Sequence, residues 1–75
     1  MSKKLPSVSG KRVVHALKDF GYTVTRIKGS HHFMECDGRP SVTVPVHGNH
    51  DIARGTLRSI LEDAAISQDD FIDRL

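Results

Sequence analysis

The chain has 75 residues, a formal net charge of +2 and a single cysteine, Cys36. Domains typically contain about 50–200 residues, so we predict one domain over residues 1–75. A single cysteine excludes an intramolecular disulfide, and no apolar run approaches the roughly 20 residues that a membrane helix needs. Residues 1–6 carry charge without a following apolar segment, which argues against a secretory signal. We therefore expect a soluble protein of the cytoplasm.

The charges are distributed unevenly along the chain. Residues 1–58 contain ten Lys or Arg and four Asp or Glu, a net +6, whereas residues 59–75 contain one Arg and five Asp or Glu, a net −4. A basic body with an acidic end favours an anionic partner for the body. One-sided charge also arises by chance in short chains, so this pattern alone identifies no partner.

A first helix is predicted over residues 11–20, after a loose lead-in over residues 1–8. Its apolar residues follow the spacing i, i+3, i+4 and i+7, which places them on one helix face. They are Val13, Ala16, Leu17 and Phe20. Ser7 or Ser9 is a candidate N-cap, and Gly21 is expected to end the helix.

Three strands are predicted next, over residues 22–27, 32–36 and 41–46, because β-branched and aromatic residues are frequent there. Gly29 and Ser30 interrupt the first two runs, and residues 37–40 contain the Asp-Gly pair typical of a hairpin turn. Successive strands with short links form an antiparallel meander.

The third strand is expected to end at Pro45 or to lie at a sheet edge, because proline has no N–H for the ladder. Residues 47–51 are predicted to form a loop. Helical spacing returns from Ile52 or Ala53 onward, with Asp51 as the candidate cap. A last short helix is predicted after Ser67, whose Ser-Gln-Asp-Asp sequence resembles a capping box.

This order of elements predicts an α+β fold with a three-stranded antiparallel sheet. Each long helix has one apolar stripe, and one sheet face can bury both stripes. The layout, α-β-β-β-α with a short C-terminal helix, is like that of a small double-stranded-RNA-binding domain. The other face of the sheet is left for solvent or a partner.

The stretch from Lys28 to His32 carries groups suited to cutting a phosphodiester. Imidazole, with an unperturbed pKa of about 6.5, can take a proton from a ribose 2′-hydroxyl and return one. Lys28 and the backbone N–H groups of Gly29 or Ser30 can stabilise the developing negative charge. Neighbouring strand residues point to opposite faces, so one of His31 and His32 faces a substrate, and the alternation does not settle which.

Two other interpretations of the histidines stay open from the residues alone. A metal site can be assembled from His47, His50 and Asp51 with His31 or His32, although no cysteine pair or helical His-Glu-x-x-His spacing accompanies them. Alternatively, the histidines are ordinary loop and sheet residues, because clustered titratable groups are only probabilistic markers of a site.

Three motifs in order carry a family resemblance. They are Gly-Ser-His-His at residues 29–32, Val-Thr-Val-Pro-Val-His at residues 42–47 and Gly-Thr-Leu-Arg-Ser-Ile-Leu at residues 55–61. Residues 9–11 and 66–71 add to the likeness, which covers nearly the whole chain. The sequence resembles the HicA-like (YcfA) toxins of bacterial and archaeal toxin–antitoxin pairs.

The resemblance implies a double-stranded-RNA-binding-domain fold and a ribonuclease that cleaves mRNA without a metal or other cofactor. It also implies a HicB-type antitoxin that covers the active site. In this family the essential histidine lies in a Gly-Ser-x-His motif, which corresponds to His32. Local chemistry adds Lys28, Gly29 and Ser30 as RNA-binding residues. His47 matches a family motif for which we assign no catalytic role.

The sequence therefore favours an mRNA-cleaving toxin with His32 as its catalytic residue. The alternative is an RNA-binding module of the same fold without catalysis, because phosphate contacts alone supply most sequence-independent affinity for RNA.

Overall fold

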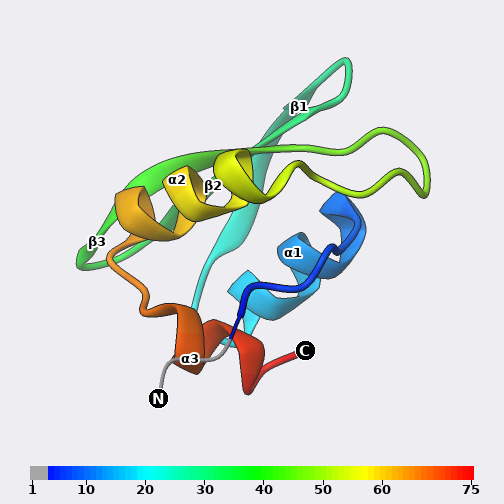
Figure 1. Cartoon of the computed structure of the whole chain (residues 1–75). Coiled ribbons are helices and arrows are strands. Elements are labelled where there is room, and N and C mark those ends of the chain that lie inside the picture. Colours follow the sequence, from blue (N-terminus) through cyan, green and yellow to red (C-terminus); the bar gives the residue numbers. More distant parts are fainter. Residues whose placement is uncertain (1–3) are drawn as a thin grey trace.

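The computed structural model describes residues 4–75. Its elements, shown in Figure 1, follow the predicted order of helix, three strands, helix and short helix. They are α1 (Gly10–Lys18), β1 (Thr23–Lys28), β2 (His31–Cys36), β3 (Arg39–Pro45), α2 (Arg54–Ala64) and α3 (Gln68–Ile72). No helix in the described part of the chain is long and apolar enough to cross a bilayer.

The three strands form one antiparallel sheet in the order β1-β2-β3, which confirms the predicted meander. Helices α1 and α2 lie on one side of this sheet, and the turn between β1 and β2 projects away from them (Figure 1). Met34, Val42 and Val44 point toward the helices and are buried, as the spacing of apolar residues requires. The helix-covered side is called the inner face below, and the opposite side the outer face.

The first helix is shorter than predicted. Ser9 is its N-cap, since the Ser9 hydroxyl accepts a hydrogen bond from the Arg12 backbone N–H at 3.3 Å. The helix ends at Lys18, so Phe20 lies beyond it in a turn. Gly21, with a φ of +99°, completes this turn but does not terminate the helix directly. The half-buried Phe20 still packs against the core from the turn, which is why it fitted the helical spacing.

The prediction of a loose lead-in over residues 1–8 is wrong for residues 4–8, the part that the structure describes. Leu5 and Val8 are 4% and 3% exposed and belong to the core, while residues 1–3 lie outside the described part of the chain. The Val8 carbonyl accepts a hydrogen bond from the Ile52 N–H at 2.8 Å. The segment is therefore held by the loop that precedes α2, a contact that local sequence patterns do not show.

The same contact explains why Asp51 is not the cap of α2. Asp51 forms an isolated antiparallel bridge with Ser9, so the chain stays extended there. The helix begins at Arg54, and its N-cap residue Ala53 offers no side-chain hydrogen bond. In the short helix α3, by contrast, the predicted cap is confirmed, because the Ser67 hydroxyl accepts from the Asp70 N–H at 3.1 Å.

The strand limits differ from the prediction by one or two residues. Tyr22 precedes β1 and its side chain is buried. The Tyr22 hydroxyl donates a hydrogen bond to the Pro40 carbonyl at 2.7 Å. Arg39 and Pro40, predicted in a turn, belong to β3, because Arg39 pairs with Cys36 directly after the two-residue turn. The strand ends at Pro45 as predicted.

Candidate active site

His32 lies on the inner face of β2, near the exposed end of the sheet. Its register partners are Ile27 in β1 and Val44 in β3, and it shares its face with Met34, two residues later. His31 is paired with Lys28 and Pro45 and points to the outer face. The two histidines therefore face opposite sides of the sheet, with His32 on the inner face and His31 on the outer face.

The His32 ring is half-buried and asymmetric in its surroundings. Its Nδ1 atom is buried and has no hydrogen-bond partner within residues 4–75. The ring as a whole is partly exposed, so it is not sealed inside the core.

The three predicted RNA-binding residues form the end of the β1–β2 hairpin. Gly29 has a φ of +59°, as a glycine at the first position of a tight hairpin turn permits, and a Cβ placed there would meet nothing within 4 Å. Ser30 is half-buried, and its carbonyl accepts the Val46 N–H at 2.7 Å. Lys28 is exposed but lies on the outer face with His31, so the structure does not place it on the same face as His32.

The loop after β3 approaches the hairpin but does not complete a metal site. The bond from Val46 to Ser30 ties the start of this loop to the hairpin turn. His47 and His50 are exposed in the loop, and the His47 carbonyl accepts the His50 N–H at 2.9 Å. Within residues 4–75 no three His, Cys, Asp or Glu side chains are grouped so that they could hold a metal ion. The metal interpretation therefore has no cluster of ligands to support it.

Sequence reasoning missed Ile27 as a candidate contact residue. It was predicted only as the last residue of the first strand, yet its apolar side chain is 60% exposed and sits opposite His32 on the inner face. The helices cover β3 and leave this edge of β1 open, as Figure 1 shows. No local signal in the sequence distinguishes a covered strand edge from an open one, so only the packing of the helices identifies Ile27.

Comparisons with known proteins agree with this architecture. A model of the family described as "HicA toxin of bacterial toxin-antitoxin" matches residues 10–66. A solved structure described as "Toxin-Antitoxin complex from Streptococcus pneumoniae" contains a similar chain with 31% sequence identity and a TM-score of 0.65. The match covers 81% of this chain and 100% of that chain. A search of curated proteins finds no significant match.

Proposed function

Because the chain belongs to the HicA toxin family of bacterial toxin–antitoxin systems, we propose that it is an endoribonuclease that cleaves mRNA without a metal ion. His32 is its proton-transfer group. The observation that supports this role is the half-buried ring at the open end of the sheet, whose Nδ1 atom has no hydrogen-bond partner within residues 4–75. Such a ring combines a fixed position with access for a substrate.

The chemistry is an attack of a ribose 2′-oxygen on the adjacent phosphorus. The 2′-hydroxyl loses its proton, the bond from phosphorus to the 5′-oxygen breaks, and the 5′-oxygen takes a proton. The products are a 2′,3′-cyclic phosphate and a free 5′-hydroxyl. Nε2 of His32 exchanges one of these protons with the RNA, a contribution of typically about 10²–10⁴-fold in rate.

The hairpin turn holds the phosphate beside this ring. The open space above Gly29 lets the backbone approach a phosphate closely, and backbone N–H groups at Gly29 and Ser30 can donate to its oxygens. The Lys28 ammonium adds positive charge at the tip from the outer face, through a long side chain. These three residues bind the RNA backbone and carry no base specificity.

The partner is a HicB-type antitoxin that covers His32. The similar solved chain comes from a toxin–antitoxin complex, which supports an antitoxin partner for this chain as well. The exposed Ile27 lies beside His32 on the inner face and offers an apolar anchor for this partner. An antitoxin bound there blocks the path to Nε2.

The test is cleavage of a labelled RNA in EDTA by the wild type, His32→Ala and His31→Ala. His31 is a matched control, since it is the adjacent histidine on the opposite face. We expect the wild type and His31→Ala to cleave at comparable rates, and His32→Ala to be slower by about 10²–10⁴-fold with an unchanged thermal unfolding curve. A 2′-deoxy substitution at the cleavage site should block the reaction.

Two outcomes would contradict the proposal. Cleavage that needs an added divalent cation rules out the metal-free mechanism. RNA that is bound by the wild type but never cut, in the presence or absence of a metal, indicates the non-catalytic RNA-binding module, which the net +6 of residues 1–58 also favours.

A further inference from the structure

The outer face of the sheet presents one aromatic ring in a polar surface. Phe33, the residue after His32, is half-buried there and lies opposite Thr43 in β3. Thr25 and Ser41 also line the shallow cleft along this ring. Neither long helix covers this side of the sheet (Figure 1). An aromatic ring on an uncovered, polar sheet face is not needed for the core, so it is available to a ligand.

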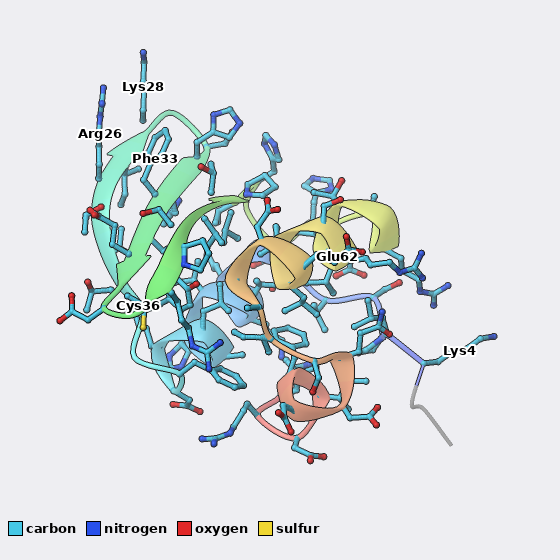
Figure 2. All side chains as sticks on the ribbon, turned by 90° about the vertical axis from the view of Figure 1, so that its left-hand side faces the viewer. Lys4, Arg26, Lys28, Phe33, Cys36 and Glu62 are labelled. Carbon is cyan, nitrogen blue, oxygen red and sulfur yellow. The ribbon has the colours of Figure 1, made fainter. Side chains whose placement is uncertain are left out.

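A guanidinium group lies over this ring. The Arg26 Cζ atom is 5.7 Å from the Phe33 ring centroid, and the two residues are register partners across β1 and β2. Figure 2 shows Arg26, Lys28 and Phe33 gathered at the same end of the sheet. A flat cation and an aromatic ring on neighbouring strands offer two surfaces on which a planar group can stack.

The charge around this pair is mainly positive toward the hairpin turn. Lys28 and His31 are register partners on the outer face, beside Arg26 and Phe33. Glu35, the acidic residue at an outward position of β2, lies on the other side of Phe33, away from the turn. The surface therefore combines a stacking ring with the Arg26 and Lys28 cations, which matches a nucleotide in both its base and its phosphate.

We propose that the outer face binds an unpaired base of the RNA, which stacks on Phe33 beside Arg26 while Lys28 contacts the neighbouring phosphate. The choice of RNA as the ligand rests on the proposed function. A protein partner is the alternative occupant of this face, and the test below separates the two.

The stacking site and His32 are linked by the hairpin turn. Phe33 and His32 are adjacent in β2 but face opposite sides, so a strand of RNA that crosses the turn at residues 29–30 reaches both. The turn is open, since a Cβ at Gly29 would meet nothing within 4 Å. An unpaired strand can make this bend and a stiff duplex cannot, so the site selects single-stranded RNA.

The test is the affinity for a single-stranded 2′-O-methyl oligonucleotide, which cannot be cleaved because the attacking hydroxyl is blocked. Stacking of one base on an aromatic side chain corresponds to about 5-fold to about 150-fold in affinity. We expect Phe33→Leu to weaken binding within this range and Phe33→Tyr to retain it. Phe20→Leu is the matched control, because Phe20 is also half-buried and also lies under an arginine, Arg74 at 5.1 Å, but on the helix side.

Two further measurements sharpen the result. An oligonucleotide with abasic positions should bind the wild type and Phe33→Leu equally, because it has no base to stack. Lys28→Gln should reduce the slope of log affinity against log salt by about one, whereas Phe33→Leu should leave the slope unchanged.

The proposal is overturned if Phe33→Leu binds the 2′-O-methyl RNA with the affinity of the wild type. It is equally overturned if Phe20→Leu lowers this affinity as much as Phe33→Leu does. It is also overturned if Phe33→Leu weakens only the antitoxin complex, which makes the face a protein-docking surface. Binding that depends on Phe33 in a protein that cuts no RNA supports this inference and contradicts the proposed function, so the two failures are distinguishable.

Discussion

The two ends of the sheet differ in how strongly they are tied to the rest of the molecule. At the β2–β3 turn, Arg39 donates to the Ala64 and Ala65 carbonyls, both at 3.0 Å, and Tyr22 donates to the Pro40 carbonyl. At the β1–β2 turn, a hydrogen bond from the Val46 N–H to the Ser30 carbonyl connects the turn to the loop after β3. In Figure 2, Cys36 marks the end of the sheet at the β2–β3 turn, and Lys28 marks the end at the β1–β2 turn.

This contrast suggests a division of roles within one small sheet. The anchored end orients the sheet against α2, and the open end exposes the groups that a ligand can reach. Arginine illustrates the difference, because Arg39 donates hydrogen bonds to helix carbonyls while Arg26 lies over the half-buried Phe33 ring. Substitutions at the anchored end should therefore change stability, and those at the open end should change binding and catalysis.

The largest difference in stability is expected between the two arginines. Arg39 satisfies carbonyls at the C-terminus of α2 that have no partner within the helix, and hydrogen bonds to charged groups contribute about 1.5–3 kcal/mol. We expect Arg39→Ala to lower the free energy of unfolding by about that amount, and Arg26→Ala by less than about 0.5 kcal/mol. Urea denaturation measures both, and equal losses would contradict the contrast.

A smaller loss is expected for Tyr22→Phe. The substitution removes the hydrogen bond to the Pro40 carbonyl but keeps the buried ring, so about 0.5–1.5 kcal/mol should be lost. Thermal or urea unfolding of the purified variant gives this value. RNA cleavage per folded molecule should not change, and a large loss of activity would mean that the anchored end takes part in the site.

The same tyrosine predicts a pH dependence. Burial, with a further contribution from Cys36, raises the pKa of Tyr22 above its ordinary value near 10, while Arg39 acts in the opposite direction. The folded state then holds its proton more tightly than the unfolded state. The stability from this group is complete below about pH 10 and is lost as the pH rises toward the folded pKa. From about pH 8 to about pH 11, the wild type should lose stability more steeply than Tyr22→Phe, and parallel curves would contradict this.

The smallest effect on stability is expected for Ile27→Thr at the open end. The side chain is 60% exposed and threonine keeps the β-branched shape that suits a strand, so unfolding should change by less than about 0.5 kcal/mol. Binding of the antitoxin should weaken, because the apolar anchor is lost. A destabilised protein with normal antitoxin affinity would contradict both parts.

The sequence predicted most of the architecture because the local signals were strong. The alternating strand over residues 41–46, the Asp-Gly turn and the Ser67 cap all depend on nearby residues, and each appears in the structure with shifts of one or two positions. Asp51 failed as a cap because a distant partner, Ser9, holds it in an extended bridge. Local patterns cannot show such pairings between segments that are far apart in sequence.

The candidate site shows where sequence reasoning ends. The residue types at the hairpin turn left His31 and His32 both open, and the family resemblance selected His32, which the register places on the inner face. Lys28 was expected on the substrate side with His32, and it lies on the outer face. The exposure of Ile27 and the contact between Arg26 and Phe33 depend on where the helices pack and how the strands pair, which the sequence alone does not specify.

The most direct test of the account is the ratio of single-turnover RNA cleavage rates between the wild type and His32→Ala, measured in EDTA with both proteins folded. The account predicts a ratio of about 10²–10⁴ in favour of the wild type and a 2′,3′-cyclic phosphate on the product. A ratio near one, or cleavage that begins only after a divalent metal is added, would contradict it.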